Sequence, residues 1–117
     1  VQSDRFAAAD ALCAALSCVV VLKGAGTLVK APDAMTRVVA AGNPGMAVAG
    51  MGDTLTGVIA ALRAQGLPAA SAALHGALLH GVAGDEAASN GGERGLLPSD
   101  LIAHLRCVAN ALSTETR

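Results

Sequence analysis

The stretch GNPGMAVAGMGDTLTG, at residues 42–57, joins an expected strand to an expected helix. Four glycines precede one acidic residue, and from there the apolar residues follow helical spacing. Glycine permits positive φ angles and lets a ligand approach the main chain closely. The first backbone N–H groups of a helix lack partners within the helix and lie at the positive end of its dipole. The stretch therefore predicts an anion-binding turn at a helix amino terminus.

Asp53, the acidic residue of this stretch, permits two interpretations. Asp is a preferred N-cap residue, because its side-chain oxygen accepts a hydrogen bond from an unpaired helix N–H. Asp53 can alternatively act as a general base beside a nest of backbone N–H groups. The density of glycine before Asp53 favours the base, since a cap alone needs no such glycines.

Two common phosphate-binding patterns do not fit the stretch. Residues 45–50 have the glycine spacing of a P-loop, but Met51 and Gly52 follow where that motif needs Lys and then Ser or Thr. Residues 50–55 begin like a dinucleotide-binding fingerprint and lack its third glycine. The stretch is therefore interpreted as a different kind of anion-binding turn.

A second candidate segment is the turn at residues 23–27. It follows the apolar and mostly β-branched residues 18–22, which predict a strand buried on both faces, as in a parallel sheet. Ligands of open α/β sheets bind at the carboxyl ends of strands. Lys23 can therefore reach a phosphate, or it can be a surface lysine whose stem covers apolar neighbours.

Composition limits the classes of function. The chain has 117 residues, 53% of them hydrophobic, which indicates one globular domain or part of one. A net charge of −1 and a single aromatic residue, Phe6, argue against nucleic-acid binding. No apolar run has the length of a membrane span, and no signal peptide is visible.

No metal site is predicted. The cysteines lie in apolar contexts without metal-ligand spacing, which predicts buried, reduced thiols in a cytoplasmic protein. These cysteines are Cys13, Cys18 and Cys107. His75 and His80 lie about 140° apart on an expected helix, so one ion could not easily bind both. His104 has no partner of ligand spacing either.

Periodicity and turn residues predict the other elements. Helices are expected at about residues 3–16, 53–65, 69–88 and 99–112, and a β-hairpin at residues 27–30 and 36–40. Three glycines in the third helix each cost roughly 1 kcal/mol relative to Ala, which indicates very close packing against a neighbour. These glycines are Gly76, Gly81 and Gly84.

Caps and inward faces are also expected. Ser3 is the expected cap of the first helix and Ser99 that of the last. Asp85 is expected to be solvated near a helix end, as is Glu86. The inward residues are expected to be Ala8, Leu12, Ala15 and Leu16 in the first helix, Leu55, Val58, Ile59 and Leu62 in the second, and Leu101, Ile102, Leu105 and Val108 in the last.

The sheet looks incomplete. At most three strands with four helices make a poor sheet on their own, and the strand at residues 18–22 needs further neighbours. The fold class is therefore α/β, and the chain looks like the second half of a larger domain.

Several blocks together carry a family resemblance. They are VVLKGAGT at residues 20–27, GNPGMA at 42–47, GMGDTLTG at 50–57, HGVAGD at 80–85 and GLLPSDLI at 95–102. In this order they resemble the carboxyl-terminal half of the NAD(P)H-hydrate dehydratases, members of the ribokinase-like superfamily. The resemblance implies that residues 1–117 are the carboxyl-terminal part of a three-layer α/β/α sandwich, in a domain more than twice this length.

The resemblance implies a repair reaction on a damaged cofactor. Such an enzyme is a hydro-lyase that uses ADP or ATP to remove water from the S epimer of hydrated NADH or NADPH. The ring hydroxyl attacks the terminal phosphorus of the nucleotide, and the phosphate ester is then eliminated. Mg²⁺ would arrive with the nucleotide. The implied partners are the amino-terminal half of the domain, an upstream epimerase domain in many relatives, and further copies of the chain in a homo-oligomer.

The resemblance also assigns roles to residues. Asp53 matches the base that takes the hydroxyl proton and contacts the substrate, and Asn43 matches a second substrate contact. The backbone N–H groups that would stabilise the transferred phosphoryl group belong to Gly50, Met51 and Gly52. The adenine nucleotide would be held by Gly52 and by the turn residues Lys23, Gly24, Ala25, Gly26 and Thr27.

Two other functions stay open from the sequence. A vitamin or sugar kinase of the same superfamily would share the glycine-rich turn and the base. A non-catalytic nucleotide-binding fragment that acts with a partner chain would share only the turn.

Overall fold

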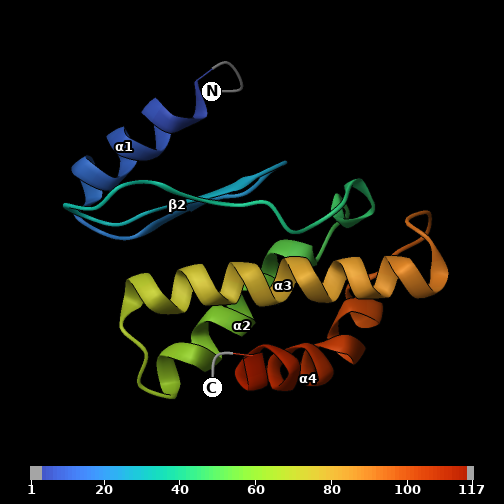
Figure 1. Ribbon diagram of the computed structural model, residues 1–117. Coiled ribbons are helices and arrows are strands. Elements are labelled where there is room, and N and C mark those ends of the chain that lie inside the picture. Colours follow the sequence, from blue (N-terminus) through green and yellow to red (C-terminus); the bar gives the residue numbers. More distant parts are fainter. Residues whose placement is uncertain (1–3, 116–117) are drawn as a thin grey trace.

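The computed structural model describes residues 4–115 of the chain (Figure 1). The elements are α1 (Arg5–Leu16), β1 (Val20–Leu22), β2 (Thr27–Lys30), β3 (Arg37–Val39), the short 3₁₀ helix η1 (Pro44–Met46), α2 (Met51–Ala64), α3 (Ala69–Gly91) and α4 (Pro98–Glu115). The expected helices and the hairpin are all present, with α3 three residues longer than predicted.

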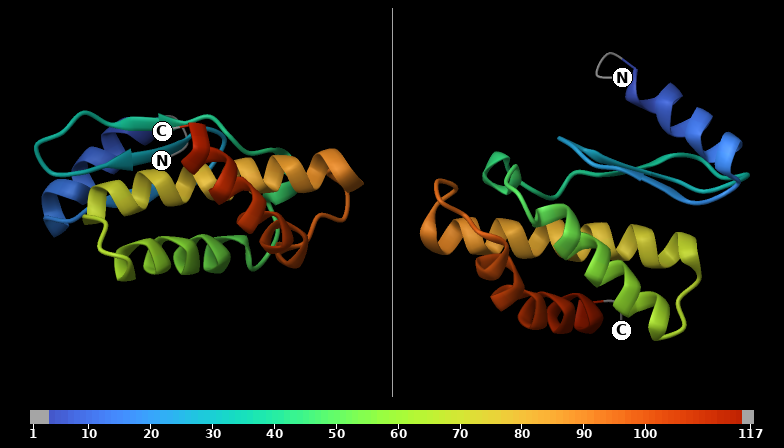
Figure 2. Two further views of the ribbon diagram at one scale, coloured as in Figure 1. Left: turned by 60° about the horizontal axis from the view of Figure 1, so that its bottom comes forward. Right: turned by 180° about the vertical axis from the view of Figure 1, so that it is seen from behind.

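The elements form three layers. Helix α1 lies on one side of the sheet, and α2, α3 and α4 lie on the other (Figures 1 and 2). Helix α3 contacts β2 and β3 and also packs against α2 and α4. The long helix α3 therefore connects the sheet to the remaining helices.

All strand pairs within residues 4–115 are antiparallel. The order of the sheet is β1-β2-β3, with Leu22 opposite Leu28 and Leu28 opposite Val38. The predicted hairpin of β2 and β3 is confirmed. The prediction for residues 18–22 was wrong, because β1 pairs antiparallel and its side chains are only half-buried. A continuous β-branched run does not reveal strand direction, and β1 is an edge strand here.

Two apolar clusters form the core on the side of α3. Cluster one joins Val29 and Val39 of the sheet to Leu55, Ala73 and Ala77 of α2 and α3. Cluster two lies between the helices and consists of Met51, Ala83, Ala87, Leu96, Leu101 and Val108. Leu28 and Leu101 are the largest fully buried side chains, and burial of each contributes roughly 1.5–3 kcal/mol.

Helix α1 packs with a different face from the one predicted. Its buried residues are Ala9 and Cys13, whereas Leu12 and Leu16 are exposed. Ala15 is exposed too, and Ala8 is half-buried. The helix is apolar on most sides, so periodicity could not select its face, and the small residues are the ones that let it approach the sheet. Ser3 lies outside the described residues, and the observed N-cap is Asp4, which accepts a hydrogen bond from the Ala7 N–H at 3.0 Å.

Helix α4 also differs in detail from its prediction. It begins at Pro98, so Ser99 lies within the first turn and is not the cap. The carboxylate of Asp100 instead accepts a hydrogen bond from the Leu97 N–H at 2.9 Å, which satisfies a helix donor from the third position. Ile102 is exposed, while Leu101 and Val108 are buried as expected.

The prediction of buried cysteines is correct for one of the three and wrong for the other two. Cys13 is buried, but Cys18 and Cys107 are exposed, and all three are free thiols. No helix among the described residues has both the length and the apolar character needed to cross a membrane.

The glycines of α3 confirm the predicted close packing. A Cβ atom added to Gly81 would lie 2.6 Å from the carbonyl oxygen of Ala41. At Gly76 it would lie 2.6 Å from Cγ1 of Ile59, and at Gly84 it would overlap the side chain of Met46. These glycines let α3 lie directly against α2 and against the segment that follows β3.

We predict that Gly81→Ala destabilises the protein by about 1–3 kcal/mol, because the new methyl group meets a backbone carbonyl that cannot turn away. Gly57→Ala in α2 is the matched control, since nothing lies within 4 Å of its added Cβ. The control should leave stability unchanged or raise it by up to about 1 kcal/mol. Urea unfolding measures both, and equal stabilities of the two variants would contradict the packing described.

Candidate active site

The larger pocket of the described residues lies where the predicted site segments meet. Its volume is about 700 Å³. Its walls are the turn at residues 23–27, most of segment 40–49, the first turns of α2 (Met51, Gly52, Leu55) and the middle of α3 (Ala77, His80, Gly81). The structure therefore brings together the two segments that the sequence singled out separately.

The amino terminus of α2 opens into this pocket with unpaired donors. Gly50 is the N-cap with φ 93° and ψ −15°, a left-handed conformation that favours glycine. Met51 donates its N–H to the Val48 carbonyl at 3.4 Å. The N–H groups of Gly52 and Asp53 donate to no group within residues 4–115. These free donors lie at the positive end of the helix dipole.

Lys23 adds a positive charge at the same place. Its Nζ atom lies so close to Gly52 that a Cβ atom at that position would overlap it. Lys23 forms no hydrogen bond or ion pair with any residue from 4 to 115. An ammonium group beside a helix amino terminus is electrostatically unfavourable unless an anion joins them, so the arrangement suits a phosphate.

Asp53 lies at the third position of α2, and not at the N-cap. The helix begins two residues earlier than predicted, because Gly50 supplies the cap conformation, so the N-cap interpretation of Asp53 was wrong. The Asp53 side chain is exposed, it forms no interaction with the described residues, and it is not among those that line the pocket. It follows Gly52, which does line the pocket, and no described residue binds its carboxylate.

Arg5 of α1 holds the turn at residues 23–27, a role that the sequence analysis missed. Its guanidinium donates to the carbonyl oxygens of Ala25 at 2.8 Å and of Leu22 at 3.1 Å. A Cβ atom at Gly24 would lie 2.9 Å from Nη2 of Arg5. From the α1 side, the arginine therefore holds one carbonyl of the turn and the carbonyl of the strand residue just before it.

Asn43 lines the pocket, but its side-chain amide is engaged inside the protein. Nδ2 donates to the Asp85 carboxylate at 2.9 Å and to the Gly84 carbonyl at 3.2 Å. Oδ1 accepts from the Gly45 N–H at 3.1 Å. The expectation that Asp85 is a solvated surface carboxylate was therefore wrong, because it is half-buried and paired with the loop.

His80 supports α2 from α3. It is 7% exposed, and its Nε2 donates to the Met51 carbonyl oxygen at 3.1 Å. Burial lowers the pKa of His80 below its ordinary value of 6.5; the hydrogen bond to Met51 acts against this, and the charge of Lys23 acts with it. His80 is therefore a neutral, oriented donor beneath the first turn of α2.

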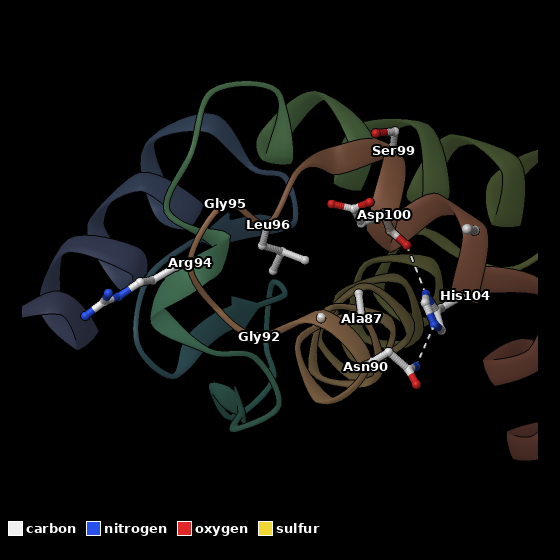
Figure 3. Close-up of a pocket in the computed structure, with 11 residues that line it drawn as sticks. Ala87, Asn90, Gly92, Arg94, Gly95, Leu96, Ser99, Asp100 and His104 are labelled. Carbon is white, nitrogen blue, oxygen red and sulfur yellow. Dashed lines mark hydrogen bonds between the residues drawn. The ribbon is translucent and has the colours of Figure 1, made fainter.

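A second, smaller pocket of about 300 Å³ lies between the end of α3 and the start of α4 (Figure 3). Nδ2 of Asn90 in α3 donates to Nε2 of His104 in α4 at 3.0 Å, and Nδ1 of His104 donates to the Asp100 carbonyl oxygen of its own helix at 2.9 Å. Arg94 points away from this pocket (Figure 3). None of the predicted site residues lines it.

Residues 4–115 contain no group of three or more His, Cys, Asp or Glu side chains placed to hold a metal ion. A divalent cation does not need such a group when it enters a site on the phosphates of a nucleotide. Mg²⁺ commonly binds in this way, with few protein ligands.

The fold and this pocket define a three-layer α/β domain with an anion-binding helix terminus, and comparisons with known proteins narrow the class. The model of the NAD(P)H-hydrate dehydratase family matches residues 1–106. The chain is 53% identical over 110 residues to a bifunctional NAD(P)H-hydrate repair enzyme of Coxiella burnetii, covering 94% of the chain and 22% of that protein. It is 43% identical over 114 residues to an ADP-dependent (S)-NAD(P)H-hydrate dehydratase of Neisseria meningitidis, covering 97% of the chain and 38% of that protein.

Solved structures agree with this assignment. An ADP/ATP-dependent NAD(P)H-hydrate dehydratase from Bacillus subtilis, co-crystallised with ATP and Mg²⁺, superimposes with a TM-score of 0.88 at 31% identity. The match covers 94% of this chain and 40% of that one. The chain therefore belongs to the NAD(P)H-hydrate dehydratase family and has its ribokinase-like fold. It spans about two fifths of the length of the dehydratases and about a fifth of the bifunctional enzymes.

We predict that the free energy of unfolding falls as the pH drops below about 6.5. Because burial lowers the pKa of His80, the unfolded chain binds a proton at a higher pH than the folded protein does. The contribution of His80 is thus complete above the unfolded pKa and is lost as the pH falls toward the folded pKa. His80→Gln, which keeps an N–H for Met51, should flatten this slope in urea unfolding.

His75→Gln is the control for this prediction, because His75 is an exposed histidine of the same helix. It should keep the slope of the unmodified protein. A slope that His80→Gln leaves unaltered would show that His80 is not a buried neutral group.

Proposed function

We propose that this chain is the part of an ADP- or ATP-dependent (S)-NAD(P)H-hydrate dehydratase that carries the base and the phosphoryl-binding turn. The observation that carries the proposal is the convergence of the Lys23 ammonium with the free N–H groups of Gly52 and Asp53. The names of the family and of the relatives support the substrate class, and they favour the dehydratase over a kinase of the same fold.

In the proposed reaction, the ring hydroxyl oxygen of the hydrated cofactor attacks the terminal phosphorus of the nucleotide. The O–H proton passes to the Asp53 carboxylate, and the bond from phosphorus to the bridging oxygen breaks, which releases AMP from ADP or ADP from ATP. The C–O bond of the new phosphate ester then breaks and phosphate leaves with the bonding electrons. The adjacent ring carbon loses a proton to water, so the double bond forms again and the reduced nicotinamide ring is restored.

The α2 amino terminus would serve this reaction by positioning and electrostatics. The terminal phosphoryl group would lie against the N–H groups of Gly50, Met51 and Gly52, and the Met51 N–H would first leave its 3.4 Å hydrogen bond to the Val48 carbonyl. Donors fixed at a helix amino terminus stabilise the charge of such a group. Asp53 is adjacent in the chain and has no competing partner within residues 4–115.

The turn at residues 23–27 would hold the nucleotide. Arg5 already satisfies the Ala25 carbonyl oxygen of the turn and the Leu22 carbonyl oxygen just before it, and the turn lines the same pocket as Gly52 and Asn43. Asn43 would contact the substrate as part of residues 42–45, whose conformation its side chain stabilises. Mg²⁺ would enter on the nucleotide's phosphates, where it neutralises part of their charge.

Residues 1–117 would be the carboxyl-terminal part of a single ribokinase-like domain. The remainder of the domain would complete the substrate pocket, since the longer relatives extend well beyond the matched region. An epimerase domain, a homo-oligomeric state and a cytoplasmic location remain predictions.

We expect Asp53→Asn to lower kcat roughly 10²–10⁴-fold, the usual contribution of a general base, while ADP binding stays largely intact. The measurement is recovery of NADH absorbance from hydrated NADH with ADP and Mg²⁺, using the complete protein that contains this chain. Glu86→Gln, which neutralises another exposed helical carboxylate, should retain full activity. Turnover of Asp53→Asn within a few-fold of the unmodified enzyme would count against the role of Asp53. Accumulation of a stable phosphorylated product would indicate a kinase.

A further inference from the structure

The block HGVAGD at residues 80–85 docks the segment that follows β3. Gly81 lies against the Ala41 carbonyl, and Gly84 lies against the side chain of Met46. Asp85, one helical turn after Gly81, supplies the polar contact of this docking face. The proposed chemistry uses none of these three residues, although each contacts a residue that lines the larger pocket.

The carboxylate of Asp85 holds two consecutive residues of that wall. Oδ2 accepts from the Gly42 N–H at 3.0 Å, and Oδ1 accepts from Asn43 Nδ2 at 2.9 Å. Asp85 is half-buried, and it forms no ion pair within residues 4–115. Its charge is therefore balanced by two N–H donors of the loop, and hydrogen bonds to an ionised acceptor are the stronger kind.

These contacts act together with the Gly84 carbonyl, which also accepts from Asn43 Nδ2, and with the Met46 N–H, which donates to the Asn43 carbonyl. Gly42 has φ 126°, a conformation that L side chains rarely adopt, and its N–H has no other acceptor among the described residues. The Asn43 side chain donates to Asp85, and its Oδ1 accepts a hydrogen bond from the Gly45 N–H. Asn43 therefore links Asp85 to Gly45. The Asp85 carboxylate thus constrains the chain from Gly42 to Gly45, which lies along the pocket.

We propose that Asp85 is a positioning residue that shapes the substrate side of the pocket by holding Gly42 and Asn43. This inference rests on the proposed dehydratase function. In that proposal the turn at residues 23–27 binds the nucleotide. The wall that Asp85 holds would therefore contact the hydrated nicotinamide. Loss of the carboxylate therefore acts on hydrate binding more than on nucleotide binding.

The test compares Asp85→Asn with Glu86→Gln in the complete protein. Asn at position 85 keeps the shape of the side chain but turns one acceptor into an N–H group facing the Asn43 amide. We expect the KM for hydrated NADH to rise roughly ten-fold, with the KM for ADP within about two-fold of the unmodified value. Hydrogen exchange at the Gly42 amide should accelerate by about ten-fold or more. Glu86→Gln removes an exposed carboxylate at the next position and should change none of these quantities.

Asp85→Glu keeps the charge and is the second variant if Asp85→Asn does not fold. Its displaced carboxylate should raise the KM for the hydrate in the same direction by a smaller factor. Unchanged KM values, an equal rise in both KM values, or a loss of thermal stability with unchanged kinetics would each overturn the positioning role. If the unmodified protein restores no NADH absorbance, the proposed function fails and the inference fails with it; an active protein with unchanged Asp85 variants refutes the inference alone.

Discussion

The chemistry of the pocket depends on one electrostatic arrangement, in which a lysine ammonium lies beside the positive end of a helix. The Nζ atom of Lys23 lies where a Cβ atom on residue 52 would be, so a side chain there would displace the flexible end of the lysine. Neither the ammonium nor the first free N–H groups of α2 have a partner within residues 4–115. Two repelling positive groups are stabilised when an anion lies between them, and a phosphoryl group has the required charge and acceptors.

Contacts from the rest of the fold hold the turn that carries Lys23 and the start of α2 in place. Arg5 fixes the turn that carries Lys23 from one side of the sheet. On the other side, His80 fixes the first peptide of α2, and Asp85 fixes the loop at Gly42. Helix α3 supplies both of the latter contacts, and its glycines let it approach closely enough to make them. The pocket is therefore built from parts far apart in sequence that α3 aligns.

The sequence was sufficient to predict the helices, the hairpin and the two segments that line the larger pocket. Helical periodicity located α2 and α3, and turn residues located the hairpin, because these signals are local. The direction of β1 and the buried face of α1 could not be predicted. Strand direction depends on partners elsewhere in the chain, and α1 is apolar on most sides.

Long-range polar contacts could not be predicted from the sequence either. Asp85 looked solvated because nothing nearby in sequence pairs with it, and its partners lie 42 and 43 residues away. The same holds for Arg5, which reaches a turn 20 residues later. The Gly-Asp pair suggested a cap at Asp53, but the cap is Gly50, whose φ of 93° no local pattern required.

The most direct test of the anion-binding arrangement is an NMR titration of the complete, ¹⁵N-labelled protein with ADP and Mg²⁺, compared with adenosine. If a phosphoryl group accepts hydrogen bonds from the start of α2, the amide proton resonances of Gly52 and Asp53 will move strongly downfield with ADP and stay in place with adenosine. Equal shifts with both ligands, or unchanged Gly52 and Asp53 amides at saturating ADP, would contradict the account.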